Sequence, residues 1–260
     1  MNPVCKEIRE DILRISKESG HGHIPSCFSI TEILYSIYDI MKHNPANPDW
    51  EERDIFVLSK GHAALTHYCV LAKFGYFTID EVYSFGGFMS DFGCHADRHK
   101  VPGVEVATGS LGHGIGVAVG MALGLKIKKT DRRVFVVIGD GESNEGSVWE
   151  AIMVAVNLRL NNLHIVYDNN RSHARGLQID NPVSHFAGFG CDTSEVDGHS
   201  VDELKEKIIE AGNTVRVIVA NTKKGFGCRA LVENHYEWHR KSPNDEEFEK
   251  LMAELDEKTI

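Results

Sequence analysis

The stretch GDGESNEGSVWEAIMVAVNLRLNNLHIVYDNN, residues 139–170, carries the strongest structural signal in the chain. It follows the β-branched run RVFVVI at 133–138, continues through an apolar helical pattern, and ends on the short run LHIVY at 163–167. A strand, a crossover helix and a second strand in this order predict a right-handed parallel unit. Asp140 and Asn170 each follow one of the two strands. We therefore expect both side chains at the carboxyl edge of one sheet, where open α/β sheets bind ligands.

The residue types at that edge indicate a metal and a phosphate group. The Asp140 carboxylate and the Asn170 amide carbonyl are hard oxygen ligands, suited to Mg²⁺, with Ca²⁺ or Mn²⁺ as alternatives. Gly139 and Gly141 let phosphate oxygens approach backbone N–H groups, and the N-terminus of the following helix adds a favourable dipole. Either the GDG triplet or the NN pair alone is ordinary turn chemistry. Their spacing around a strand, a helix and a strand favours the metal–diphosphate interpretation.

The rest of the chain extends the same architecture. Strands that alternate with helices predict an α/β fold with a central, mostly parallel sheet and helices on both faces. Residues 84–110 form a long Gly-rich loop, and loops of that length inside a compact domain tend to be functional. We expect residues 242–260 to form a solvated acidic helix. Further helices are expected at 3–18, 30–41, 63–74, 114–128, 145–160 and 200–211, and further strands at 54–58 and 215–220.

Composition and charge restrict the class of protein. The 260 residues, 42% hydrophobic and 25% charged, suit one large globular domain. The net charge of −10 argues against a nucleic-acid-binding surface, because polyphosphate selects basic faces. The first twenty residues lack the apolar stretch of a signal peptide, and the longest apolar runs are too short or too rich in glycine to span a bilayer. The six cysteines include no C-x-x-C pair, so we expect free thiols and a cytoplasmic protein.

Five segments in collinear order resemble the transketolase family. Residues 139–170 resemble its thiamine-diphosphate motif, and 102–124 resembles its T-G-[PS]-L-G-Q-G stretch. The other three are SGHGHIPSCFSITEIL (19–34), NPANPDWEERDIFVLSKGHAA (44–64) and TKKGFG (222–227). The likeness covers nearly the whole chain and implies the thiamine-diphosphate-binding fold of that family. It implies that residues 1–260 form one diphosphate-binding domain.

The resemblance also implies roles for individual residues. Asp140 and Asn170 would bind the metal through their side chains, and Ser172 through its backbone carbonyl. His23, His95 and His239 would face the substrate and the reacting carbon. The residues implied to contact thiamine diphosphate are His62, Gly109, Ser110, Leu111, Gly139, Asp140, Gly141, Glu145, Asn170 and His239, with Glu145 also at an interface between subunits. The expected surface or packing histidines are His99, His164, His173, His185 and His199.

The chemistry of ketol transfer is a reason to expect histidines at the site. The reaction moves protons to and from hydroxyl and carbonyl groups and builds negative charge on oxygen in each half-reaction. Imidazoles can donate, accept and stabilise such oxygens near neutral pH. Without the resemblance, a histidine in a Gly-rich loop such as His95 would more often be incidental.

The resemblance implies an incomplete active site. Transketolases continue into a pyrimidine-binding domain, which carries the glutamate that activates the cofactor, and a C-terminal domain. Neither has a counterpart in this sequence, so both are expected on a partner chain. The implied protein is the N-terminal subunit of a two-component transketolase, a heterotetramer (alpha2beta2) that moves a two-carbon ketol unit from a ketose to an aldehyde acceptor.

Several departures from the family pattern fall on the substrate side. The glutamine of L-G-Q-G is His113 here, and the third histidine segment reads Cys94-His95-Ala96 instead of G-H-P. Residues 171–176, RSHARG, replace the usual segment after the metal asparagine, and Arg240 and Lys241 follow His239 in place of a small pair. A specialised sugar is therefore expected, with Arg175, Arg240 and Lys241 as candidates for an anionic group. Solvated surface cations are the other interpretation of these residues, and His21 and His113 receive no role.

Two other functions would also use features of this sequence. One is another thiamine-diphosphate lyase, either a 2-oxo-acid decarboxylating subunit or a deoxyxylulose-phosphate synthase, which would share the metal motif. The other is a cofactor-binding subunit without turnover, which has no need of four retained histidines. A dinucleotide site would rest only on residues 112–116, GHGIG, which follow a loop and not a clear strand.

Overall fold

The sheet is fully parallel in this computed structural model, which describes residues 1–172, 176–177 and 179–257. Its five strands run in the order β1-β2-β3-β5-β4. They are β1 (Ile55–Leu58), β2 (Val134–Gly139), β3 (Leu163–Asn169), β4 (Asp192–Asp197) and β5 (Arg216–Asn221). The predicted α/β sheet is confirmed. The edge strand β4 was not predicted, because its sequence DTSEVD lacks the apolar alternation that marks a strand.

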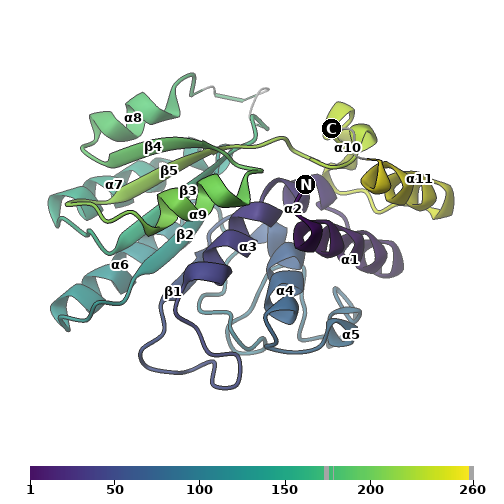
Figure 1. Cartoon of the computed structure of the whole chain (residues 1–260), viewed down its shortest axis with the longest axis horizontal. Helices are drawn as coiled ribbons and strands as arrows, with labels where there is room; N and C mark the ends of the chain where they lie inside the picture. The colour runs from purple at the N-terminus through teal and green to yellow at the C-terminus, as the bar shows by residue number, and fades with distance from the viewer. Residues whose placement is uncertain (173–175, 178, 258–260) are drawn as a thin grey trace.

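Helices cover both faces of the sheet (Figure 1). The predicted first helix ends at Gly20, whose φ of 71° closes it in the left-handed conformation. The helix predicted at 30–41 is preceded by a separate short helix, α2. The helices are α1 (Pro3–Ser19), α2 (Ile24–Ser29), α3 (Thr31–Ile40), α4 (Ala64–Lys73), α5 (Ile79–Val82), α6 (Gly114–Ile127), α7 (Gly146–Asn157), α8 (Pro182–Gly188), α9 (Val201–Ile209), α10 (Arg229–Glu233) and α11 (Asp245–Asp256), with 3₁₀ turns η1 (Gly61–Ala63), η2 (Glu142–Asn144) and η3 (Glu237–His239).

The core lies in two layers, one on each face of the sheet. Along β2, Val134, Val136 and Ile138 pack with residues of α6, α7 and α8. Phe135 and Val137 point the other way and pack with residues of α1, α3, α4 and α9. This alternation follows from the two-residue period of a strand. It leaves the carboxyl ends of the strands at one edge, between the two helical layers.

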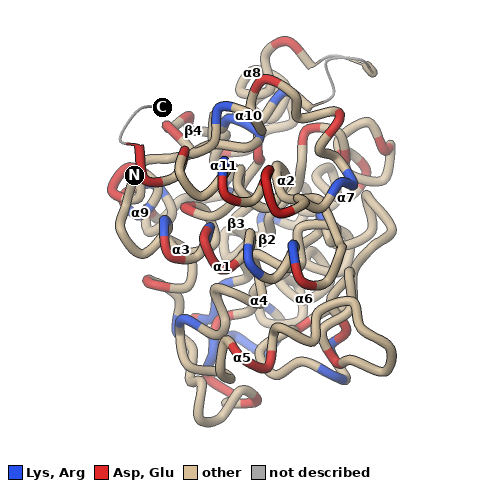
Figure 2. Tube along the Cα trace, turned by 90° about the vertical axis from the view of Figure 1, so that its right-hand side faces the viewer, with Lys and Arg blue, Asp and Glu red and all other residues tan. Residues whose placement is uncertain are grey.

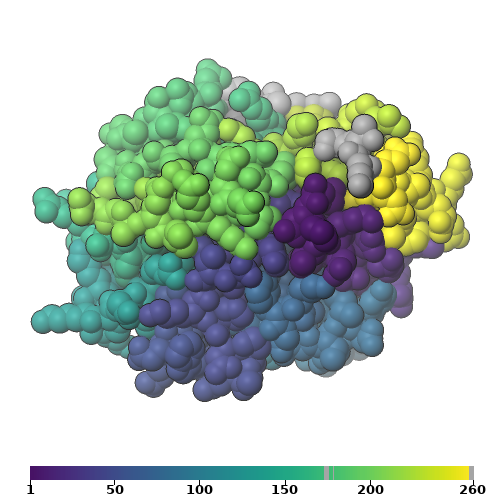
Figure 3. Space-filling view, in the orientation of Figure 1, coloured from purple at the N-terminus to yellow at the C-terminus, as the bar shows by residue number. Residues whose placement is uncertain are grey.

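The C-terminal helix α11 packs on α1, so the prediction of a solvated helix was wrong. Leu251 and Leu255 are buried, and Phe248 packs against the same core. Residues spaced three and four apart form one apolar stripe, which requires a neighbouring surface. The Lys17 ammonium lies 2.8 Å from the Asp245 carboxylate and 4.5 Å from the centre of the Phe248 ring. The space-filling view shows the N-terminal (purple) and C-terminal (yellow) segments side by side (Figure 3).

The surface carries charges of both signs. Figure 2 shows Asp and Glu interspersed with Lys and Arg along the chain. Within the described ranges, none of the helices combines the length and the apolar character that crossing a membrane requires. The six cysteines, all of them described, are free thiols, and five of them are buried, as expected.

Candidate functional site

The ends of four neighbouring strands form the candidate site. In the pairing of β2 with β3, Gly139 lies opposite Asp168, and the Asp140 N–H donates to the Asp168 carbonyl at 3.2 Å. Asp140 and Asn170 are both buried at this edge. The sequence prediction that they share the carboxyl edge of one sheet is therefore confirmed.

The three residues predicted to bind metal contact one another. The Ser172 hydroxyl donates to Asp140 Oδ1 at 2.8 Å, and the Ser172 N–H donates to Asn170 Oδ1 at 2.9 Å. One carboxylate, one amide oxygen and a nearby backbone carbonyl form a donor set that fits a hard divalent cation. Among the described residues, no cluster of three or more His, Cys, Asp or Glu side chains could hold a metal. A metal here would depend on the neutral oxygens as well as on Asp140.

Asp168 is a buried hub that was not predicted. Its Oδ2 accepts hydrogen bonds from Lys60 Nζ at 2.5 Å, Asn170 Nδ2 at 2.7 Å and Ser29 Oγ at 2.9 Å, and its Oδ1 accepts from Thr222 Oγ1. Burial raises the pKa of this carboxyl, but the Lys60 ammonium and these hydrogen bonds outweigh burial and hold the pKa below its ordinary value. The Asp168–Asn170 bond leaves the amide oxygen of Asn170 turned toward Ser172.

Glu142 is a second buried carboxylate that was not predicted. It accepts hydrogen bonds from Ser59 Oγ at 2.5 Å, Gly112 N at 2.9 Å and Gly139 N at 3.2 Å. It thereby joins the ends of β1 and β2 to the loop before α6. Glu142 also begins the 3₁₀ turn η2, and α7 starts only at Gly146. The N-terminus of α7 therefore lies one short turn after Asp140, within one residue of the start at 145 expected from the sequence.

Four of the predicted histidines converge beside this edge. The His23 ring lies 5.6 Å from that of His62 and 5.2 Å from that of His239. The His95 ring packs on Gly109, where an added Cβ would lie 3.2 Å from the ring. The φ of 157° at Gly109 is a second reason for glycine at that position.

The electrostatics keep several of these rings neutral. Burial, with the neighbouring His239 and Arg240, lowers the pKa of His23 to about 4. Burial also lowers the pKa of His62 and that of His239, and Lys224 lowers both further. A neutral imidazole has one donor nitrogen and one acceptor nitrogen. At neutral pH these rings can therefore donate to one substrate oxygen and accept a proton from another.

Lys224 adds a buried cation that was not predicted. Its side chain is largely buried, and among the described residues it makes no side-chain hydrogen bond or ion pair. Burial and the charge of Lys60 lower the pKa of Lys224 to about 8, whereas Asp140 and Asp168 raise it. An ammonium that lies near the Lys60 cation and has no fixed partner among the described residues is suited to an anionic ligand.

The other predicted residues lie around this centre. Ser110 and Glu145 are exposed, and Leu111 is half-buried. Gly112 packs on Glu145, and its φ of 79° brings the loop close to the start of α7. Lys241 pairs with Glu237 at 3.0 Å and with Glu247 at 2.5 Å, and stacks on Trp238, whereas Arg240 is exposed beside His239. His173 and Arg175 lie outside the described residues.

The segment His21-Gly22-His23 brings the two ends of the chain together. The His21 ring lies under Gly86, and its Nε2 is 3.3 Å from the Gly86 carbonyl. His23 has a φ of 70°, which is strained for a residue with a side chain. At Gly22, an added Cβ would overlap the Arg240 carbonyl group and lie 2.8 Å from Lys241 N. Gly22 therefore permits the close approach that places His239 beside His23.

Gly22→Ala is expected to separate His23 from His239. The added methyl group must displace the Arg240 backbone, so we expect a loss of about 1–3 kcal/mol in the free energy of unfolding and a larger loss of activity. Chemical denaturation and an activity assay would measure the two effects. Gly188→Ala is the control, because an added Cβ there meets no described atom within 4 Å. Wild-type turnover by Gly22→Ala would contradict this account of His239.

Comparisons with known proteins place this site in a family. Residues 4–256 match the family model described as transketolase, thiamine diphosphate binding domain. An apulose-4-phosphate transketolase subunit of Actinobacillus succinogenes is 36% identical over 260 residues, which cover 96% of this chain and 94% of that protein. The 6-deoxy-6-sulfo-D-fructose transketolase subunit of Clostridium sp. (strain MSTE9) is 35% identical over 258 residues, with the same coverage of both chains.

Longer relatives match over only part of their length. The transketolase of Mus musculus is 36% identical over 265 residues, which cover 98% of this chain and 42% of that enzyme. The crystal structure of transketolase from Campylobacter jejuni superposes with a TM-score of 0.90 at 26% identity, and covers 98% of this chain and 43% of that one. The chain thus spans about two fifths of the full-length enzymes it matches and nearly the whole of the two subunits.

Proposed function

The chain belongs to the transketolase family as its N-terminal, thiamine-diphosphate-binding subunit, and we propose that it transfers two-carbon ketol units together with a partner chain. The observation that carries this proposal is the convergence of His23, His62 and His239 beside the Asp140–Asn170–Ser172 cluster. The three imidazoles suit proton movement on a sugar. The oxygen atoms of the Asp140–Asn170–Ser172 cluster suit a divalent metal with a diphosphate.

We propose that the strand ends hold the cofactor through its diphosphate. Asp140, Asn170 and the Ser172 carbonyl would bind Mg²⁺, with the N–H groups around Gly139 and Gly141 facing phosphate oxygens. Lys224 and His62 would contact the diphosphate from the other side, because the Lys224 ammonium is buried without an ion-pair partner among the described residues. Gly109, Ser110, Leu111 and His239 would face the rings of the cofactor.

The histidines would then handle the protons of the sugar. Bound thiamine diphosphate supplies the nucleophilic carbon that the reaction requires. His23 and His95 would donate hydrogen bonds to the carbonyl and hydroxyl oxygens of the donor and acceptor. His239 would move a proton at the reacting carbon's oxygen. The lowered pKa of His23 keeps its ring neutral, so that it can both give and take a hydrogen bond.

A partner chain would complete the site. The exposed position of Ser110 and Glu145 beside the cofactor segment supports a surface that a second polypeptide covers. That partner would supply the pyrimidine-binding domain and its activating glutamate. We propose a heterotetramer of two copies of each chain, with Glu145 at the interface, acting in the cytoplasm.

We propose an anionic sugar as the substrate. The names of two relatives that match along their length refer to a sugar phosphate and a sulfonated sugar. Of the cations named from the sequence, Lys241 is neutralised by two glutamates, whereas Arg240 makes no ion pair among the described residues and lies beside His239. Arg240 is therefore the candidate for the phosphate or sulfonate group.

The test is reconstitution with the partner. The chain, its partner, Mg²⁺ and thiamine diphosphate are expected to move a glycolaldehyde unit from a phosphorylated or sulfonated ketose to an aldose. His23→Ala is expected to lower kcat by about 10²–10⁴-fold, and His185→Ala, at an exposed position, to leave it unchanged. Release of carbon dioxide from pyruvate without ketol transfer would favour the lyase alternative. Cofactor binding without any turnover would favour a non-catalytic subunit.

Cofactor affinity is expected to fall above pH 8. The diphosphate favours protonated Lys224, whose pKa is lowered to about 8 in the free protein. The affinity for thiamine diphosphate therefore has its full value below pH 8. It falls as the pH rises through 8, by up to about tenfold per pH unit. Isothermal titration of thiamine diphosphate at fixed Mg²⁺ measures this, and Lys224→Met should flatten the profile. An affinity that stays level up to the ordinary lysine pKa of about 10.4 would remove Lys224 from the site.

A further inference from the structure

The turn after β5 delivers Lys224 to the candidate site. This turn, residues 222–226, is fixed by three backbone hydrogen bonds to other parts of the fold. The Thr222 N–H donates to the Asn169 carbonyl at 3.3 Å, and the Gly225 N–H donates to the Pro25 carbonyl at 3.0 Å. Between them, the Lys223 N–H donates to Nε2 of His199 at 2.8 Å. The bond to His199 thus lies directly before Lys224 and the bond to Pro25 directly after it, and of these two only the first depends on a side chain.

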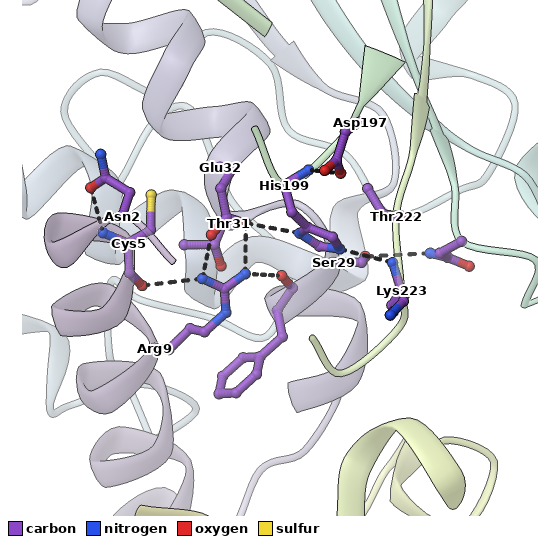
Figure 4. A network of polar contacts seen from close by, with 12 residues as sticks. Asn2, Cys5, Arg9, Ser29, Thr31, Glu32, Asp197, His199, Thr222 and Lys223 are labelled. Carbon is purple, nitrogen blue, oxygen red and sulfur yellow. Dashed lines mark hydrogen bonds and ion pairs between the residues drawn. The ribbon is translucent and has the colours of Figure 1, made fainter. Parts of the chain in front are cut away.

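The protonation of His199 follows from its two partners. A backbone N–H can only donate, so His199 Nε2 accepts from Lys223 and the ring proton is on Nδ1. His199 Nδ1 lies 3.1 Å from Glu32 Oε2, so it donates to that carboxylate. Figure 4 shows the imidazole between Glu32 on one side and the Lys223 backbone on the other. Both ring nitrogens of His199 therefore already make a hydrogen bond.

Glu32, which accepts the hydrogen bond of His199 Nδ1, is itself held by a buried ion pair. Glu32 accepts two hydrogen bonds from the Arg9 guanidinium, each at 2.6 Å, and both side chains are fully buried. A third Arg9 bond, at 2.8 Å, reaches the Phe28 carbonyl. The His199 ring also stacks on Phe226, with centres 3.7 Å apart and planes 11° apart. The imidazole thus joins the α1–α3 layer to both ends of the Lys223–Phe226 segment.

We propose that His199 is a positioning residue that holds Lys224 in the diphosphate site through the Lys223 N–H. The proposal rests on the function proposed above, in which Lys224 contacts the diphosphate. Its physical basis is that the Lys224 ammonium, buried without an ion-pair partner among the described residues, would gain hydration by leaving the interior. The backbone therefore has to be held in place for Lys224 to remain there.

Two substitutions separate the two bonds of His199. An asparagine amide reaches the position of Nδ1 and can still donate to Glu32, but it leaves the Lys223 N–H without its acceptor. A glutamine amide reaches the position of Nε2 and restores an acceptor for Lys223, but it gives up the Glu32 bond. In the enzyme assembled with its partner, at fixed Mg²⁺, His199→Asn is expected to raise the Kd of thiamine diphosphate about tenfold. His199→Gln is expected to retain most of the affinity.

A double-mutant cycle tests whether His199 acts through Lys224. If it does, adding His199→Asn to Lys224→Met raises the Kd no further, although each change alone raises it. Thermal unfolding of each variant without cofactor shows which of them remain folded. Equal Kd increases in the asparagine and glutamine variants, or additive effects in the cycle, would overturn the proposal. An unchanged Kd in Lys224→Met alone would instead overturn the contact between Lys224 and the diphosphate, and this inference with it.

Discussion

Asp140→Ala is expected to weaken Mg²⁺-dependent binding of thiamine diphosphate by more than about 100-fold and to abolish ketol transfer. Loss of a residue that only supports a metal ligand already costs about 10–100-fold, and Asp140 is the single carboxylate of the predicted donor set. The two other donors, Asn170 and the Ser172 carbonyl, are neutral. Without Asp140, the metal would have no anionic protein ligand to hold it beside the diphosphate.

Binding is measured by titrating the cofactor into the assembled enzyme over a wide range of Mg²⁺ concentrations. Asp49→Ala is the matched control, because Asp49 is an exposed carboxylate in the loop before β1, away from the carboxyl edge of the sheet. Normal transfer by Asp140→Ala across the whole range of metal concentrations would mean that the metal binds elsewhere.

Asp168→Ala is expected to have the largest effect on folding. The substitution leaves the Lys60 ammonium buried without its partner, and Ser29, Thr222 and Asn170 each lose an acceptor. Removing one member of a buried ion pair costs about 3–5 kcal/mol. The Asn170 amide also becomes free to rotate, so metal affinity should fall even in molecules that remain folded.

Urea denaturation measures the loss of stability, and Mg²⁺ titration measures the loss of affinity. Asp131→Ala is the control, because it breaks an exposed pair with Lys42 and should change stability little. A double variant, Lys60→Met with Asp168→Leu, removes both charges and should recover much of the stability but none of the metal affinity. Equal stability of Asp168→Ala and the wild type would show that Lys60 finds another partner.

The features that the sequence predicted best are those that depend on local spacing. The strand–helix–strand unit around Asp140 and Asn170 could be predicted because β-branched runs and a glycine turn mark both strands. Their meeting at one edge then follows from the handedness of parallel connections. The edge strand β4 could not be predicted in the same way, because its side chains are mostly polar. The packed face of α11 was missed because its acidic residues mask the apolar stripe.

The convergence of the histidines required the family resemblance. His23, His62 and His239 come from three distant segments, and no local pattern shows that they meet. The structure supplies the missing information through close backbone approaches, such as that of Gly22 to Arg240. The sequence does contain one indication of the role of Asp168. It is a charged residue inside the apolar run of β3, two positions before Asn170 and therefore on the same face. A charge in such a place usually has a buried partner.

The packing of α11 on α1 has a consequence for biosynthesis. His239 lies shortly before α11, and this part of the chain is fixed to α1, where Ser242 Oγ donates to the Ser16 carbonyl at 2.6 Å and Lys17 pairs with Asp245. The helix α1 can pack on α2, α3 and α4 soon after synthesis, but its contact surface for α11 stays open until α11 has emerged. All five strands precede α11 in the chain, so the sheet can form earlier. The His239 side of the proposed site is therefore fixed last, and a nascent chain stalled before α11 would hold a formed sheet and an open site.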